Sequence, residues 1–296
     1  MVSVTTNALT GLEETHNSYF DIPWVRQKNL DSLRLDGHDT ALHKVPSHAT
    51  FTIDFYARLL PATELIVTFH GANMVRHSYP RFERIQSFKD DAPALLAFAD
   101  PTLQFRKGLL LTWYVGGPGW DPAYEIVQII RHAMAECGAK HVLFVGGSGG
   151  GHPALRLSAM INESTAFVQS PTTVIENSIP ATVEQYFQTI WPGHDRRSVI
   201  DGEPTRFSMP ALYAARHPGN SVYYLQNLND PTFIKEHYRP LKSVYLDRDA
   251  PCGTSPDGSK KFVLFDSELE RHGPPTPGEF NLHLRQARSL RQPNSH

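Results

Sequence analysis

The feature that most restricts the fold of this 296-residue chain is a series of short, nearly continuous runs of apolar residues. Each run stops at a glycine or a polar residue. Strands buried on both faces have such runs, whereas strands with one solvated face alternate apolar and polar residues. The runs are residues 65–69, 109–115, 142–145, 165–168, 222–225 and 261–265. We therefore predict that they form the strands of a mostly parallel sheet.

Helical patterns alternate with these runs. Residues 124–137 carry apolar side chains at three- and four-residue spacing and stop before Gly138, and residues 153–160 begin with a proline, which a first helical turn tolerates. We expect a closing surface helix at residues 279–290 and a half-buried strand at residues 48–56. The alternation predicts an α/β fold, in which helices cover both faces of a mostly parallel twisted sheet.

One segment, residues 172–217, interrupts this alternation. It combines a helical pattern at residues 181–190 with several prolines and glycines on either side. We interpret the segment as a lid or cap inserted above the sheet of a single domain that spans residues 1–296.

Composition argues against several other classes of protein. Lys and Arg total 28 and Asp and Glu total 30, for a net charge of −2, so the chain has no excess of positive charge for nucleic acid. No apolar run is long enough to span a bilayer, and residues 1–16 lack the pattern of a signal peptide, so a cytoplasmic location is the default expectation. Cys137 and Cys252 have no metal-ligand spacing, and we expect neither a metal nor a cofactor.

The motif that carries chemistry is the Gly-Gly-Ser-Gly-Gly segment at residues 146–150, which fits G-x-S-x-G. It follows the apolar run 142–145 and precedes the helical pattern 153–160, as a nucleophile elbow does. A serine on such a sharp turn has a strained backbone, and glycines on either side remove steric clashes. The motif predicts that Ser148 is a nucleophile, and in this context the chain resembles the α/β-hydrolase superfamily over residues 48–272.

The resemblance implies an oxyanion hole. One amide would come from Gly149, the residue after the nucleophile, and the other from the turn that follows the His-Gly pair at residues 70–71. Because the chain lacks a full His-Gly-Gly-Gly motif, the second donor is either Ala72 or Asn73.

The same glycines also fit a phosphate-binding loop, since Gly149, Gly151 and Ala154 match a relaxed dinucleotide fingerprint. However, no acidic residue ends the next apolar run, 165–168, and the lysine of a Walker loop is missing. The nucleophile interpretation is therefore favoured.

The superfamily's chain order is serine, then acid, then histidine. Asp230 follows the run 222–225, and His272 lies in a Gly/Pro-rich loop after the run 261–265, so we predict that they complete a triad with Ser148. The other candidates are Asp247, Asp249 and Asp266 for the acid, and His237 and His283 for the base. His152, one helical turn after the serine, is expected to line the pocket or pack beneath it.

This triad predicts a serine hydrolase that cleaves a carboxylic ester through an acyl-enzyme intermediate. Acyl transfer by the same triad and a non-catalytic binding module remain alternatives. Trp113, Tyr114 and Trp120 flank a glycine-rich loop, where they would either bind a sugar or acyl group or pack in the core. The chain is also similar to bacterial α/β hydrolases associated with surface glycans and accessory secretion, which suggests a small-molecule or glycan ester as substrate.

Overall fold

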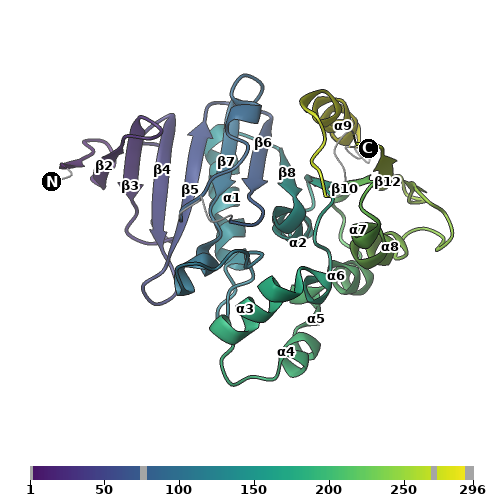
Figure 1. Ribbon diagram of the computed structural model, residues 1–296. Coiled ribbons are helices and arrows are strands. Elements are labelled where there is room, and N and C mark those ends of the chain that lie inside the picture. Colours follow the sequence, from purple (N-terminus) through teal and green to yellow (C-terminus); the bar gives the residue numbers. More distant parts are fainter. Residues whose placement is uncertain (1–2, 74–78, 268–271, 291–296) are drawn as a thin grey trace.

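A single mixed sheet organises the computed structural model, which describes residues 3–73, 79–267 and 272–290 (Figure 1). In these parts of the chain, twelve strands pair in the order β1-β2-β3-β4-β5-β7-β6-β8-β9-β10-β12-β11. The strands are β1 (Val4–Thr6), β2 (Glu13–Asn17), β3 (Ile22–Arg26), β4 (Thr40–Pro46), β5 (Thr52–Leu59), β6 (Glu64–Phe69), β7 (Ala94–Phe98), β8 (His141–Gly147), β9 (Ser164–Gln169), β10 (Ser221–Asn227), β11 (Gly253–Thr254) and β12 (Lys260–Phe265).

Helices connect and cover these strands. The α-helices are α1 (Ala123–Cys137), α2 (Gly151–Ser158), α3 (Pro180–Ile190), α4 (Arg196–Gly202), α5 (Pro204–Phe207), α6 (Met209–Arg216), α7 (Pro231–Phe233), α8 (Arg239–Lys242) and α9 (Pro277–Ser289). Short 3-10 turns are η1 (Gln86–Phe88), η2 (Pro101–Phe105), η3 (Ser148–Gly150) and η4 (Ile175–Asn177), and η5 (Ile234–Tyr238) is a π-helical turn.

The register of the parallel strands brings the loops that follow them to one edge of the sheet. Neighbours from β7 through β6, β8, β9 and β10 to β12 are parallel. Phe69 at the end of β6 lies beside Gly146 of β8, and Gly147 lies beside Gln169 at the end of β9. The turn after β6 and the serine after β8 therefore leave the sheet together.

Burial on both faces explains the apolar runs. In β8, Val142 and Phe144 pack into the core beneath α1, α2 and α6, whereas Leu143 and Val145 pack into the core beneath α9. Successive side chains of a strand point to opposite faces, so each face needs its own apolar layer. The predicted α/β fold is confirmed, with helices on both faces of a mostly parallel mixed sheet (Figure 1).

The predicted strands at residues 65–69, 142–145, 165–168, 222–225 and 261–265 are confirmed as parts of β6, β8, β9, β10 and β12. The predicted helices at residues 124–137, 153–160, 181–190 and 279–290 are likewise confirmed to within a few residues as α1, α2, α3 and α9. Of the strand expected at residues 48–56, only the part from Thr52 onward belongs to β5.

The predicted strand at residues 109–115 is wrong, because this segment forms a buried loop. Trp113 and Tyr114 have φ values of +49° and +58°, which no strand accommodates. The carboxylate of Asp100 accepts hydrogen bonds from the Thr112 hydroxyl (2.6 Å) and from the Tyr114 amide (3.0 Å). The strand at this stage of the chain is instead β7, at Ala94–Phe98, which pairs with β5 and β6.

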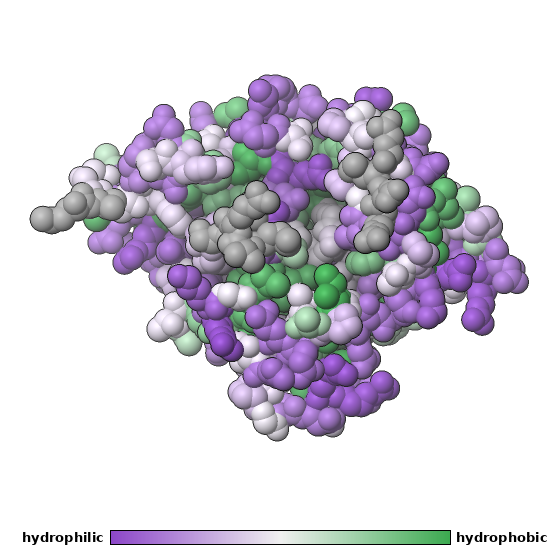
Figure 2. All heavy atoms as spheres, viewed as in Figure 1, coloured by the Kyte–Doolittle hydropathy of each residue, from purple (hydrophilic) through white to green (hydrophobic). Residues whose placement is uncertain are grey.

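The segment predicted as a lid contains α3 to α6, and its parts pack differently. Val183, Tyr186 and Phe187 of α3 belong to a separate apolar cluster with Trp113 and Phe207. In contrast, α6 packs against the central core through side chains such as Leu212 and Tyr213. On the face of the molecule that Figure 2 shows, apolar surface gathers in the middle, above the hydrophilic surface of α3 and α4 at the bottom of the view.

Candidate active site

The elbow at Ser148 has the strained geometry that the motif predicts. Ser148 follows β8 directly, is partly exposed and has a φ of +51°. A Cβ atom added to Gly146 would lie 2.9 Å from the Gly151 amide nitrogen, and one added to Gly150 would lie 2.8 Å from the His70 carbonyl oxygen. Side chains at these two positions would therefore clash with backbone, so the turn requires glycine.

The same close approaches argue against a phosphate loop. A Cβ atom added to Gly149 would lie 3.2 Å from Leu111 Cγ, and one added to Gly151 would lie 2.9 Å from Pro171 Cα. These glycines make room for other parts of the protein, whereas a phosphate loop leaves the space above its glycines open to the ligand.

Asp230 and His272 form a close pair at the same edge of the sheet. His272 Nδ1 donates a hydrogen bond to Asp230 Oδ2 over 2.7 Å, and the aspartate side chain is buried. Asp230 Oδ1 accepts a hydrogen bond from the Phe233 amide (3.1 Å) and so caps α7. The His272 ring lies 4.0 Å from the Phe233 ring, centroid to centroid. Among the described residues, Ser148 makes no hydrogen bond to His272, so the third side of the triad stays a prediction.

The alternative bases have other partners. His237 Nδ1 accepts hydrogen bonds from the amides of Thr173 (3.3 Å) and Val174 (3.4 Å), and burial lowers the pKa of this histidine to about 4. His283, on α9, pairs with the hydroxyl of Tyr223 over 2.7 Å.

The alternative acids make no described hydrogen bond to His272. Asp266 accepts a hydrogen bond from the Asn229 side chain (2.9 Å), and Asp247 accepts one from the amide of Asp249 (2.9 Å) in an exposed loop. These contacts favour Asp230 as the acid and His272 as the base.

The turn after β6 lies against the elbow, where an oxyanion hole would form. A Cβ atom added to Gly71 would lie 3.7 Å from Ser148 Cβ and 3.8 Å from the amide nitrogen of Gly149. The amide of Asn73 donates to the Leu110 carbonyl over 2.5 Å, which occupies one of the two predicted donors. This contact favours Ala72 as the partner of Gly149.

His70 has a structural role in this turn. Its Nε2 accepts a hydrogen bond from the Asp100 amide (3.0 Å), and its Nδ1 lies 2.7 Å from the carbonyl oxygen of Gly71. His152 is also structural, because it is fully buried with Nε2 3.1 Å from the Arg206 carbonyl oxygen. Burial lowers the pKa of His152 to about 3, so the ring is neutral at physiological pH.

Two residues that the sequence did not indicate hold the turn after β6. Glu83 Oε2 accepts hydrogen bonds from the Gly71 amide (3.2 Å) and from Arg81 Nη2 (3.0 Å). Arg81 Nη1 donates to the Ala72 carbonyl over 2.5 Å. Their spacing of two residues in an irregular segment carries no recognisable pattern, so only the folded chain brings them to the turn.

The three aromatic residues predicted to bind substrate are buried in packing contacts. Trp113 packs edge-on against Tyr186, and the Tyr114 hydroxyl donates to the Phe98 carbonyl over 2.9 Å. Trp120 Nε1 donates to Glu125 over 2.9 Å. These contacts support the core-packing alternative and give the substrate-binding role no support.

Three further features concern metal binding, the cysteines and membrane-spanning helices. In the described parts of the chain, no cluster of His, Cys, Asp or Glu side chains is arranged to hold a metal ion. Cys137 is buried and Cys252 is exposed, and both are free thiols. Every helix that the structure describes is too short or too polar to cross a membrane.

No protein-family model and no curated protein sequence matches the chain. Solved structures are similar to it in fold. The capsule O-acetyltransferase of Neisseria meningitidis serogroup A has a TM-score of 0.56 at 13% identity, over 84% of this chain and 97% of that one. Carboxyl esterase 2 from Tuber melanosporum has a TM-score of 0.52 at 15% identity, over 84% of this chain and 85% of that one.

A third structure, the glycosylation-associated Gap123 complex from Streptococcus agalactiae, has a TM-score of 0.59 at 17% identity. The match covers 85% of this chain and 46% of that one. The chain therefore has an α/β-hydrolase fold, as the elbow motif predicts.

Proposed function

We propose that the protein is a serine-dependent enzyme that cleaves a carboxylic ester through an acyl intermediate on Ser148. The observation that carries this proposal is the Asp230–His272 pair, joined over 2.7 Å at the edge of the sheet where β8 ends in the strained turn of Ser148. An acid and a histidine in this order after successive parallel strands fit the triad of an α/β hydrolase.

The chemistry follows from the hydrogen bonds of His272. Because Nδ1 donates to Asp230, Nε2 is the nitrogen left to accept the Ser148 hydroxyl proton as the serine oxygen attacks the ester carbon. The amides of Gly149 and Ala72 stabilise the negative charge on the former carbonyl oxygen. His272 then gives its proton to the leaving alcohol, and a water molecule, deprotonated by the same histidine, releases the acid from Ser148.

The acyl acceptor defines the second candidate, an acyltransferase that uses the same triad. The similarity to a capsule O-acetyltransferase over 97% of that chain supports it, while the similarity to a carboxyl esterase supports hydrolysis. In transfer, a substrate hydroxyl takes the place of water in the second step. A small-molecule or glycan ester is the substrate class that we propose in either case.

Covalent labelling tests the proposal directly. A fluorophosphonate probe reacts with an activated serine whatever its natural substrate, so we expect one adduct, mapped by peptide mass spectrometry to Ser148. Ser148→Ala should abolish labelling. Ser170→Ala is the matched control and should retain labelling, since Ser170 follows the neighbouring strand β9 at the same edge of the sheet and also has a positive φ, of +40°. An adduct elsewhere, or a folded protein that resists labelling, contradicts the proposal.

A panel of acyl esters then separates the two reactions. If water is the acceptor, added alcohols or sugars leave the rate of acid release unchanged. If transfer is the reaction, a sugar acceptor yields an acylated sugar at the expense of free acid. Both products must disappear in Ser148→Ala.

A further inference from the structure

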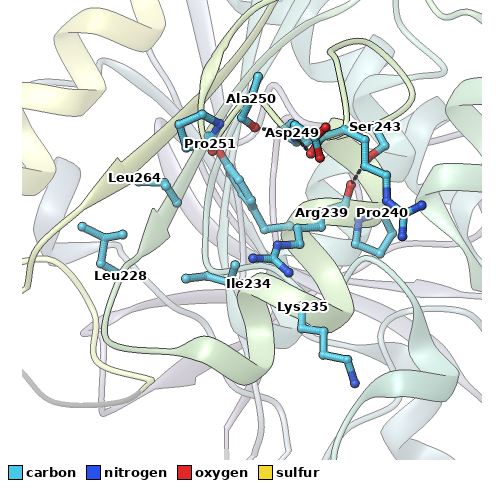
Figure 3. Close-up of a pocket in the computed structure, with 13 residues that line it drawn as sticks. Leu228, Ile234, Lys235, Arg239, Pro240, Ser243, Asp249, Ala250, Pro251 and Leu264 are labelled. Carbon is cyan, nitrogen blue, oxygen red and sulfur yellow. Dashed lines mark hydrogen bonds between the residues drawn. The ribbon is translucent and has the colours of Figure 1, made fainter.

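A cavity of about 730 Å³ is lined by residues between positions 228 and 264. Its walls come from η5, α8 and the loop at residues 247–251, together with residues that follow β10 or end β12 (Figure 3). None of Ser148, Asp230 and His272 lines it. The cavity is therefore distinct from the predicted triad.

Cationic side chains surround this cavity. Lys235, Arg239, Lys242 and Arg248 line it, against a single carboxylate, Asp249. The chain as a whole has a net charge of −2, so this excess of positive charge is local. Among the described residues, the guanidinium groups of Arg239 and Arg248 form no hydrogen bond or ion pair, so their donors are available to a ligand.

The loop that carries Arg248 is held in place. The buried Lys242 donates hydrogen bonds from Nζ to the carbonyl oxygens of Asp247 (2.8 Å) and Arg248 (2.9 Å). The Tyr238 hydroxyl donates to the Pro251 carbonyl over 3.1 Å. A wall that is ordered before binding loses little entropy when a ligand arrives.

One side of the cavity is apolar. Leu228, Ile234 and Leu264 line it, and Leu228 is 46% exposed. In Figure 3 the Arg239 guanidinium lies beside Ile234, on the side of Leu228 and Leu264, while Lys235 extends away from them. Lys235 also pairs with Glu236 over 2.9 Å. A ligand here would meet positive charge and apolar surface together.

We propose that this cavity binds a phosphate ester attached to an apolar group. A guanidinium binds phosphate oxygens through two parallel hydrogen bonds, and two free guanidinium groups match the charge of about −2 on a phosphate monoester. The apolar body of the ligand covers Leu228, Ile234 and Leu264. A carboxylate carries half this charge and binds more weakly.

Calorimetric titration of the full chain with octyl phosphate, at neutral pH and low salt, tests the proposal. Removing one charge-assisted contact should weaken binding about tenfold or more, so we expect this loss in Arg239→Ala and in Arg248→Ala. Arg216→Ala, which removes an exposed cation at the end of α6, should bind like the unmodified protein. Octanoate should bind more weakly than octyl phosphate.

Four results would overturn the proposal: no binding of octyl phosphate, equal binding of octanoate, unchanged binding in the Arg239→Ala/Arg248→Ala double variant, or an equal loss in Arg216→Ala. Ser148→Ala should bind octyl phosphate normally, so the result is independent of the proposed enzymatic activity. Co-sedimentation with phosphatidylcholine vesicles that contain phosphatidic acid, lost in the double variant, would identify a lipid head group as the source of the phosphate. Octyl phosphate binding without co-sedimentation would identify a soluble ester.

Discussion

Asp230→Asn tests the predicted triad most sharply, because the structure shows which contacts the substitution keeps. The side-chain oxygen of asparagine can still accept from the Phe233 amide (3.1 Å), so α7 keeps its cap. The new NH₂ group faces His272 Nδ1, which now has to accept a hydrogen bond. The proton of the neutral ring then moves to Nε2, and the ring can no longer take the proton of Ser148.

We expect kcat/KM to fall by up to about 10⁴-fold, the loss that follows when a triad histidine is held in the wrong tautomer. At about 1.36 kcal/mol for each factor of ten, this loss corresponds to about 5.5 kcal/mol of transition-state stabilisation. The fold should survive, because the helix cap remains and the His272 ring keeps its packing on Phe233 at 4.0 Å.

Two measurements check this prediction: hydrolysis of p-nitrophenyl acetate and the rate of fluorophosphonate labelling. Asp266→Asn is the matched control, since Asp266 directly follows β12 and accepts a hydrogen bond from Asn229 rather than from a histidine. We expect the control to lose less than about tenfold. A kcat/KM of Asp230→Asn within tenfold of the unmodified protein, or an equal loss in the control, would refute the predicted role of Asp230.

Two further predictions concern the turn after β6 and the buried histidines. Glu83→Ala removes the acceptor of the Gly71 amide, so kcat should fall about tenfold with little change in KM, and an effect on KM alone in steady-state kinetics would contradict this. Burial lowers the pKa values of His43, His152 and His237 to about 3, 3 and 4, so near pH 5 protons bind the unfolded chain in preference to the folded one. Each histidine should then cost about 2 kcal/mol of stability as pH falls from 7 to about 5, and urea unfolding midpoints that stay constant over this range would contradict the prediction.

The central strands could be predicted because burial on both faces leaves a composition that few other structures share. The run at residues 109–115 has the same composition for a different reason, since the loop is buried between the sheet and α3. The backbone amide of Tyr114 donates to the Asp100 carboxylate rather than to a neighbouring strand, and no local sequence pattern indicates that contact. In contrast, the sequence analysis did not predict β7 as a strand. Its sequence, Ala-Leu-Leu-Ala-Phe, contains alanines, which have a low strand propensity.

The candidate site also contains some residues that the sequence could predict and others that it could not. Asp230 and His272 are 42 positions apart, yet each follows a parallel strand, and the ends of parallel strands meet at one edge. The chain order of the superfamily and the positions of the strand ends together therefore indicated these two residues. The contacts of Arg81 and Glu83 depend on the path of an irregular loop, and the choice of Ala72 over Asn73 depends on a single hydrogen bond to Leu110. Neither follows from strand order.

The contacts of the inserted segment, residues 172–217, reach the loop beside the turn after β6, where we predict the oxyanion hole. The Tyr186 hydroxyl of α3 donates to the Gly116 carbonyl over 2.9 Å, and the buried Arg206 of α5 donates to the carbonyls of Gly117 (3.0 Å) and Trp120 (2.7 Å). The loop that contains these carbonyls begins beside Leu110, the partner of the Asn73 amide. A lid that opens easily has few buried hydrogen bonds to the rest of the protein. In contrast, α3 and α5 would have to break several such hydrogen bonds to move. These contacts favour a fixed wall over a hinged lid, and substitutions in the insertion should therefore affect the turn at Ala72 through the intervening loop.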